Sequence, residues 1–144
     1  MKGNNIHSDY LFVYGTLRRG VEISINKEIG GDVEWVSKSE IKGALYDIGE
    51  YPGATKSPGN KSTIRGDIFR LNNAKKVLKT LDAYEGFYPD KLSTSEYLRK
   101  KESIEMDNGE ILDVWVYWYN LPVEGKQRIR HKDYLQYLKK KKIA

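Results

Sequence analysis

Residues 10–20 of this 144-residue chain read YLFVYGTLRRG, an apolar run that is interrupted at Gly15 and followed by two arginines. The aromatic and β-branched residues at Tyr10–Tyr14 predict a strand. Gly15 would let the chain turn sharply after this strand, so that the backbone amides of Gly15, Thr16 and Leu17 could point toward one spot. Successive amides in such a turn form a concavity that binds an anion. The stretch therefore predicts a strand followed by a candidate anion site.

This segment differs from the common phosphate-binding loops. No Gly-Lys-Ser/Thr follows Gly15, as a Walker loop requires, and the three spaced glycines of the dinucleotide fingerprint are missing. A small concavity without a lysine suits a carboxylate better than a polyphosphate. On these residues alone, a plain turn with Arg18 and Arg19 on the surface is the simpler interpretation.

The second informative stretch is LDAYEG, at residues 81–86, where a helical pattern ends. Asn72 or Asn73 can cap the start of this helix, and Gly86 can end it in a left-handed conformation. Glu85 then lies at the negative pole of the helix dipole, beside aromatic residues that exclude water. Both effects raise the pKa of a carboxyl toward the range of a general base. An exposed glutamate beside a turn is an interpretation of similar weight, and Asp82, on the polar side of the helix, is expected to be solvated.

The remaining elements indicate a mixed fold. Further strands are predicted at Glu40–Ile48, Thr63–Leu71, Thr94–Met106 and Ile111–Tyr119, and a shorter second helix at Lys132–Lys140. In the strand that ends at Tyr119, both alternating faces are apolar or amphipathic, as expected of a buried strand. Several strands with few helices predict the α+β class, as a small mixed β-barrel with a few flanking helices.

Composition excludes several classes of protein. The length indicates a single domain, residues 1–144, with a lysine-rich C-terminal tail from about residue 139. The chain has no cysteine and only two histidines, His7 and His131, which excludes disulfides, thiolate chemistry and a histidine-rich metal cluster. The N-terminus lacks the apolar region of a signal peptide, and no run is long enough to cross a bilayer. We therefore expect a cytoplasmic protein that does not bind membranes.

The formal net charge of +5 at pH 7 invites comparison with nucleic-acid-binding proteins. Much of this charge lies in the terminal run LKKKKIA, however, and a run of lysines at a chain end is more often a solvated tail. No basic surface with interleaved aromatic residues is evident. Specific recognition of nucleic acid is therefore not expected.

Six stretches, taken in order, resemble the gamma-glutamylcyclotransferase-like family of AIG2-like proteins: VYGTLRRG, GALYDIGEYPGA, IRGDIFRL, LDAYEG, EYLR and VWVYWY. The resemblance covers about Leu11 to Tyr119, and Tyr-Gly-Thr-Leu and the Tyr-Glu-Gly after the helix are its most specific elements. It implies a small mixed β-barrel. It also implies an intramolecular reaction without metal or cofactor, in which the α-amine of a γ-glutamyl group attacks the γ-amide carbonyl. The products are 5-oxoproline and the amine or amino acid that had been attached.

The resemblance also implies roles for individual residues. The catalytic glutamate falls on Glu85, which would take a proton from the α-amine and pass it to the departing amine. The substrate-binding loop falls on Tyr14, Gly15, Thr16 and Leu17, whose amides would hold the α-carboxylate of a small γ-glutamyl substrate. The pocket wall and its aromatic lining are expected from Tyr51, Pro52, Gly53, Tyr97, Tyr117 and Tyr119.

Departures from the family pattern bear on substrate choice, and two alternatives to an enzyme stay open. Residues 20–36 lack the small polar or histidine residues frequent in relatives, Gly66-Asp67 stands where many have Gly-Glu, and the segment between Glu85 and Tyr97 is long. The first alternative is a non-catalytic member that binds a γ-glutamyl or amino-acid-like ligand. The second is a basic protein whose lysine tail contacts nucleic acid. Free γ-glutamyl amino acids, ε-(γ-glutamyl)-lysine and a γ-glutamyl-protected intermediate all fit as substrates.

Overall fold

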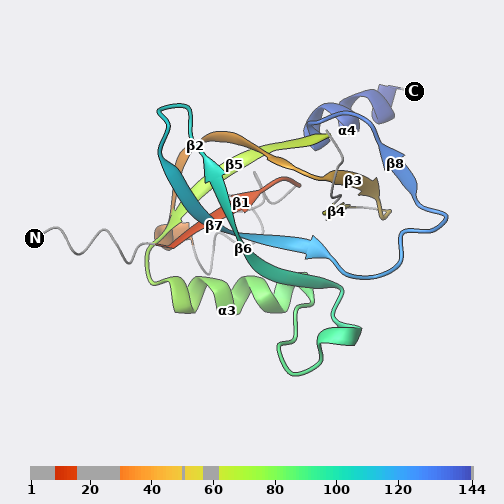
Figure 1. Cartoon of the computed structure of the whole chain (residues 1–144). Helices are drawn as coiled ribbons and strands as arrows, with labels where there is room; N and C mark the ends of the chain where they lie inside the picture. Colours follow the sequence, from red (N-terminus) through yellow and green to blue (C-terminus); the bar gives the residue numbers. More distant parts are fainter. Residues whose placement is uncertain (1–8, 16–29, 50, 57–61, 144) are drawn as a thin grey trace, which may run out of the picture.

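The computed structural model describes residues 9–15, 30–49, 51–56 and 62–143, and its elements follow the chain in a mixed order (Figure 1). The strands are β1 (Asp9–Val13), β2 (Val33–Lys42), β3 (Ala44–Asp47), β4 (Pro52–Thr55), β5 (Thr63–Leu71), β6 (Tyr97–Glu105), β7 (Ile111–Tyr119) and β8 (Gln127–Ile129). The helices are α3 (Ala74–Glu85) and α4 (Tyr134–Ile143), with short 3₁₀ turns η2 (Gly30–Asp32) and η3 (Leu92–Thr94).

The described strands form two sheets rather than one closed barrel. The larger sheet has the order β2-β5-β1-β7-β6, with β1 antiparallel to β5 and parallel to β7, and the smaller has the order β4-β3-β8. The α+β class is therefore confirmed, while closure into a barrel is not seen in these strands. The chain passes between the sheets at Gly43, where an added Cβ would lie 2.8 Å from Ile64 Cδ1. The strand predicted at residues 40–48 is divided at this point.

The larger sheet carries hydrophobic residues on both faces, because its central strands alternate. On one face, Leu11 and Tyr117 pack with Val77 and Leu81 of α3. The other face packs with the smaller sheet and with Tyr134 of α4. Helices α3 and α4 therefore cover opposite faces, as Figure 1 shows. This confirms the prediction that both faces of residues 114–119 are buried against apolar neighbours.

Helix α3 ends as predicted and begins differently. Gly86 adopts a left-handed conformation with φ 69°, and the Phe87 amide donates a hydrogen bond to the Asp82 carbonyl at 2.9 Å. At the start, Asn73 is also left-handed, with φ 53°, and its side chain makes no capping hydrogen bond. Because the helix ends at Gly86, Glu85 is its last residue and lies beside the edge of the sheet.

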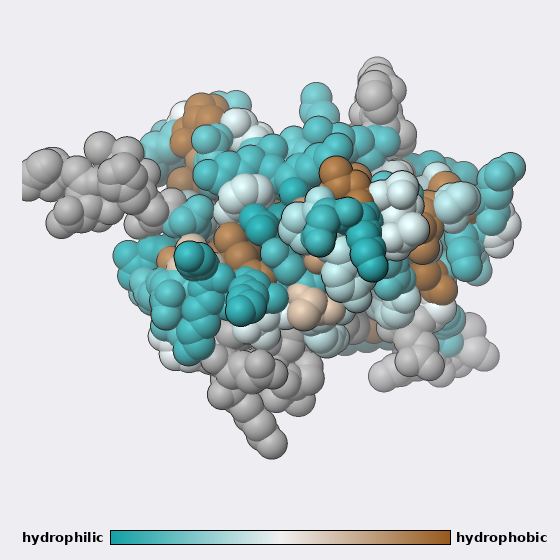
Figure 2. Space-filling model, turned by 90° about the horizontal axis from the view of Figure 1, so that it is seen from below, coloured by the Kyte–Doolittle hydropathy of each residue, from teal (hydrophilic) through white to brown (hydrophobic). Residues whose placement is uncertain are grey.

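The lysine-rich end, expected to be a solvated tail, forms the last turns of α4. The Asp133 carboxylate accepts a hydrogen bond from the Leu135 amide at 2.9 Å at the start of this helix, and Lys141 Nζ lies 2.7 Å from Asp47 Oδ2. The face seen in Figure 2, on the side of α3, is largely hydrophilic with scattered hydrophobic residues. None of the helices in the described ranges is long and apolar enough to span a membrane.

Candidate active site

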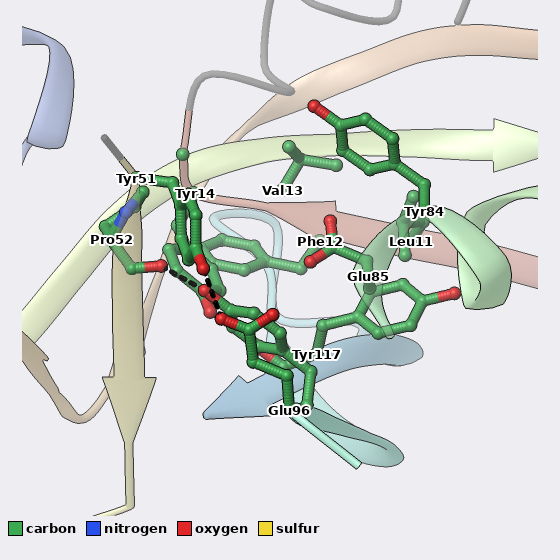
Figure 3. Close-up of a pocket in the computed structure, with 12 residues that line it drawn as sticks. Leu11, Phe12, Val13, Tyr14, Tyr51, Pro52, Tyr84, Glu85, Glu96 and Tyr117 are labelled. Carbon is green, nitrogen blue, oxygen red and sulfur yellow. Dashed lines mark hydrogen bonds between the residues drawn. The ribbon is translucent and has the colours of Figure 1, made fainter. Parts of the chain in front are cut away.

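A cavity of about 290 Å³ lies where β1 and α3 end and β6 begins (Figure 3). Among the residues proposed from the sequence, seven line it: Tyr14, Gly15, Tyr51, Pro52, Glu85, Tyr97 and Tyr117. Five others complete the lining: Leu11, Phe12, Val13, Tyr84 and Glu96. The fold therefore brings together segments that are far apart in the chain, as the sequence analysis expected.

Two of the other four proposed site residues are not described by the structure, and two are described but are not among the lining residues. Thr16 and Leu17 lie outside the described residues. Gly53 and Tyr119 pack against each other, since a Cβ on Gly53 would lie 2.7 Å from the Tyr119 ring. The Tyr119 ring in turn meets Tyr97 edge-on, with 5.4 Å between ring centroids. Tyr119 therefore contacts the lining residue Tyr97 without being a described lining residue itself.

Gly15 has a role that was not predicted from the sequence, a close approach to the start of β4. A Cβ at this position would lie 2.9 Å from Pro52 Cγ. The glycine therefore allows the end of β1 to approach the start of β4, and this close approach forms one wall of the cavity. The predicted turn that presents the amides of residues 15–17 stays a prediction, because residues 16 and 17 lie outside the described ranges.

Three tyrosine hydroxyls in the wall donate hydrogen bonds to the protein itself. Tyr14 donates to the Tyr117 carbonyl and Tyr97 to the Pro52 carbonyl, each at 2.6 Å, and Tyr117 donates to Asp82 Oδ1 at 2.7 Å. Burial raises the pKa of all three hydroxyls above the ordinary value of a tyrosine. They stay neutral and join the strands around the cavity, so their role is to hold its shape.

Glu85 extends from the last turn of α3 into the cavity (Figure 3). Burial raises the pKa of its carboxyl to about 7, and repulsion from the nearby carboxylate of Glu96 adds to this shift. The raised pKa of Glu85 agrees with the prediction from the sequence. The sequence had attributed it to the aromatic neighbours and the helix end, and the contribution of Glu96 was not predicted. Tyr84, the residue before it, is 57% exposed and still contributes to the lining.

Among the described lining residues that were not predicted from the sequence, Glu96 is the charged one. It directly precedes β6, and its amide donates a hydrogen bond to the Gly86 carbonyl at 3.0 Å, which places it beside the end of α3. Its carboxylate accepts a hydrogen bond from the Tyr51 hydroxyl, and this bond is the main cause that raises the pKa of Tyr51 to about 12. The only sequence signal was its place next to Tyr97 in the EYLR stretch.

Asp82 is not solvated, as had been expected, but paired. The Arg99 guanidinium binds it in a bidentate manner, with Nε 2.7 Å from Oδ1 and Nη2 3.0 Å from Oδ2, and both side chains are only 16% exposed. The same guanidinium lies 4.3 Å from the centroid of the Trp115 ring. With the hydrogen bond from Tyr117, this pair joins α3 to β6 and β7 one turn before Glu85.

The chemistry available in the cavity is that of a carboxyl group near neutral pH. No lysine, arginine or histidine is among the described lining residues. Nor do the residues described in the structure include a group of three or more histidine, cysteine or acidic side chains that could hold a metal ion. A half-ionised carboxyl in an aromatic cavity can take a proton from a bound ligand and return it to another atom of that ligand.

A family model and curated relatives match most of this chain. The model of the family "Gamma-glutamyl cyclotransferase, AIG2-like" matches residues 11–136. The gamma-glutamylcyclotransferase family protein YtfP of Escherichia coli K12 is 33% identical over 132 residues, which are 87% of this chain and 95% of that protein.

Two solved structures extend the comparison to the fold. The solution structure of ytfP from Escherichia coli has a TM-score of 0.60 and 29% identity, and the match covers 89% of this chain and 97% of that one. The crystal structure of an AIG2-like protein from mouse has a TM-score of 0.68 at 21% identity, with 89% and 88% covered. At that identity, the mouse structure supports the fold alone.

Proposed function

Since this chain belongs to the gamma-glutamyl cyclotransferase, AIG2-like family, we propose that it is an enzyme of the gamma-glutamylcyclotransferase type. Its substrate would be a small molecule in which a γ-glutamyl group is attached to an amine or an amino acid. The reaction closes the γ-glutamyl group to 5-oxoproline and releases the attached amine. We expect it to take place in the cytoplasm.

The observation that carries this proposal is the carboxyl of Glu85, with a pKa of about 7, inside the cavity. A carboxylate with an ordinary pKa, near 4.5, is too weak a base to take a proton efficiently from an ammonium group. A pKa near the working pH favours transfer in both directions, because the group is then present in both protonation states. Glu85 is therefore suited to serve first as base and then as acid.

In the proposed reaction, Glu85 takes one proton from the α-ammonium group of the substrate. The freed amine attacks the γ-carbonyl carbon, forming the carbon–nitrogen bond of the five-membered ring and a tetrahedral intermediate. The bond to the departing nitrogen then breaks as Glu85 returns its proton to that nitrogen. The ring nitrogen loses its second proton to solvent, and the released amine gains one from solvent, so the protons balance.

The cavity would contribute by holding the reacting groups together. We place the α-carboxylate of the substrate at the backbone that follows Tyr14, where Gly15 and Pro52 are in contact. Fixing the carboxylate there would turn the amine toward its own γ-carbonyl, and such alignment of reacting atoms is a large part of catalysis in ring closure. The tyrosine walls, whose hydroxyls are already bonded within the protein, would limit the access of water.

The test is release of 5-oxoproline from a panel of γ-glutamyl amino acids and γ-glutamyl amines, with the wild type beside Glu85→Gln. We expect the substitution to lower turnover by about a hundredfold or more, since it removes the proton acceptor and changes the shape little. Glu105→Gln is the matched control, because Glu105 is exposed on β6 and does not line the cavity.

Equal rates in the wild type and Glu85→Gln would contradict the mechanism. A protein that turns over no member of the panel, but is stabilised against heat by one of them, would be a non-catalytic binding protein of the same fold.

A further inference from the structure

We infer that a second cavity, on the smaller sheet, binds a phosphate group, either as the free ion or as part of a small molecule. This second cavity has a volume of about 160 Å³ and lies where the starts of β3 and β5 meet the end of β8, which runs beside β3 in Figure 1. Its described lining comes from residues 43–45, 62–63 and 128–131, and none of these lines the cavity around Glu85. The inference is therefore independent of the proposed function.

The first feature that supports it is the charge of the lining. Arg128 and Arg130 are two positions apart at the end of β8, and His131 follows them directly. None of the described lining residues is acidic. A cavity lined by basic groups attracts anions and raises their local concentration. Two arginines also match the charge of a phosphate group, which is close to −2 at neutral pH.

The second feature is that the acidic residues of the neighbouring strands are engaged with other cations. Among the ion pairs of the described residues, none includes the two arginines or the histidine of this lining. Glu40 of β2 binds Arg65 at 3.1 Å and lies 3.7 Å from Lys132. Asp47, at the end of β3, binds Lys141 at 2.7 Å. An anion in the second cavity would supply the negative charge that the protein itself does not place there.

The third feature is the way in which Arg128 is held. Its Nη2 donates a hydrogen bond to the Ser62 hydroxyl at 2.9 Å, which fixes the guanidinium at the wall of the second cavity. Its Nε is buried and has no hydrogen-bond partner among the described residues. A buried donor without an acceptor is unfavourable, and more so in a charged group. The guanidinium is therefore positioned without being fully satisfied, as expected where an oxyanion is the missing acceptor.

The fourth feature is that backbone hydrogen bonds hold the three lining segments together. The Gly43 amide donates to the Ser62 carbonyl at 3.1 Å, and the Arg65 amide donates to the Lys132 carbonyl at 2.9 Å. Leu45 of β3 also pairs with Ile129 of β8. The second cavity is thus formed by the fold itself, and a ligand would not have to order its walls, which lowers the cost of binding.

The geometry of arginine favours phosphate over a carboxylate as the ligand. The planar guanidinium donates two parallel hydrogen bonds to a pair of oxygens, and a phosphate group offers more than one such pair. Arg128 and Arg130 can then bind different oxygens of the same group. A carboxylate has a single pair of oxygens and a single charge, so it should bind more weakly.

The test is a titration of the full-length, 15N-labelled protein with inorganic phosphate, glycerol 3-phosphate and acetate, followed by amide chemical shifts. Sodium chloride keeps the ionic strength constant, so that screening of the basic surface does not change during the titration. We expect saturable shifts at residues 43–45, 62–63 and 128–131 with both phosphate compounds, and weaker binding of acetate. Tighter binding of the free ion or of the ester would show which of the two forms the second cavity takes.

Two substitutions test the arginines, and a third is the matched control. Arg130→Gln removes one charge, and Arg128→Lys keeps the charge but loses the planar fork. Each should weaken phosphate binding by about tenfold or more, since each removes a charge-assisted hydrogen bond. Lys126→Gln lowers the net charge equally at an exposed position that does not line the second cavity, so binding should be unchanged. If Arg128→Lys does not fold, Arg130→Gln still decides.

Shifts that do not saturate, or that are as large with acetate, would overturn the inference. Saturable shifts around Glu85 in place of the second cavity would overturn it too. The same holds if both arginine variants bind phosphate as the wild type does, or if Lys126→Gln loses as much affinity as they do, because binding would then follow net charge alone. Release of 5-oxoproline is measured separately, so failure here leaves the proposed function standing.

Discussion

Glu85 and Glu96 are eleven positions apart in the chain and contribute to one cavity. Burial first, and then repulsion from Glu96, raise the pKa of Glu85 to about 7. The other titratable side chains among the described lining residues are tyrosines, and burial keeps Tyr14, Tyr97 and Tyr117 neutral. The proton transfer proposed for this cavity therefore depends on whether Glu85 is protonated.

At the residue scale, this predicts the pH dependence of turnover. A base must be deprotonated to act, so kcat/KM should rise with pH and reach half of its plateau near the pKa of Glu85, about 7. Glu96→Gln removes the repulsion that favours the protonated form, so the pKa falls and the rise in activity moves to lower pH. Burial, the larger cause, remains, so the pKa should stay above the ordinary value of 4.5.

The measurement is a profile of kcat/KM from about pH 5 to pH 9 with the γ-glutamyl derivative of pentylamine, because its alkyl chain adds no further titrating group to the substrate. Glu105→Gln should follow the wild-type profile. A shift of the Glu96→Gln profile to higher pH, or no shift, would contradict the electrostatic coupling of the two glutamates.

At the scale of elements, the position of Glu85 depends on how the end of α3 is held. The bidentate pair of Asp82 and Arg99, together with the Tyr117 hydroxyl, ties the last turns of the helix to β6 and β7. Gly86 then ends the helix in a left-handed conformation that other residues rarely adopt. The sheet and the cap together fix the direction in which Glu85 extends.

We expect Asp82→Asn to lower the free energy of unfolding by about 2 to 4 kcal/mol, because it leaves the partly buried Arg99 charge without its partner. Turnover should fall as well, since Glu85 lies one turn further along the same helix. Urea unfolding and kcat measured on the same samples test both effects.

Glu34→Gln is the matched control for this substitution, because Glu34 pairs with Arg70 on the exposed surface of β2 and β5. Exposed pairs contribute little, so its unfolding free energy should stay nearly unchanged. Equal losses in the two variants would show that the Asp82–Arg99 pair has no special role.

Sequence patterns located some long strands well, but they missed residues 33–39 of β2, the longest described strand, as well as two short strands. Strands β5 and β7 have the predicted bounds, Thr63–Leu71 and Ile111–Tyr119. Strands β4 and β8 were not predicted, because they have only 4 and 3 residues and β4 begins with the Pro-Gly pair that usually marks a turn. Their pairing with β3 defines them, and no periodic pattern in so few residues could have indicated it.

At the scale of the whole molecule, the two helices have separate roles because the larger sheet lies between them. Helix α3 carries Glu85, and α4 covers the other hydrophobic face through Tyr134, which is 1% exposed. The end of α4 is held by Asp47, which accepts hydrogen bonds from the Tyr137 hydroxyl and Lys141 Nζ, each at 2.7 Å. A substitution in the hydrophobic cluster around Tyr134 should therefore change the stability of the protein without changing the chemistry in the cavity.

Tyr134→Ala tests this separation. We expect it to lower the free energy of unfolding by about 3 kcal/mol or more, since it removes a buried aromatic ring. At a temperature where the variant is folded, kcat should stay within about twofold of the wild type, because distant sites in a well-packed domain are usually independent. Lys140→Gln, an exposed position on the same helix, should change neither quantity. A large loss of kcat in folded Tyr134→Ala would show that α4 influences the cavity.

The sequence by itself determined what depends on neighbours along the chain. The end of α3 at Gly86, the two apolar faces of β7 and the place of Glu85 at a helix terminus all follow from spacing over a few residues. The ordered motifs identified the family, and the matches to residues 11–136 and to relatives of similar length confirmed it.

Only the tertiary structure decided which distant groups meet. It placed Glu96 beside the end of α3, paired Asp82 with Arg99, and brought Gly15 against Pro52. The physical reason is that burial and electrostatic interaction depend on distances through space, which a one-dimensional pattern does not contain. The presence of two carboxyl groups among the described lining residues of one cavity could therefore be read only from the folded chain.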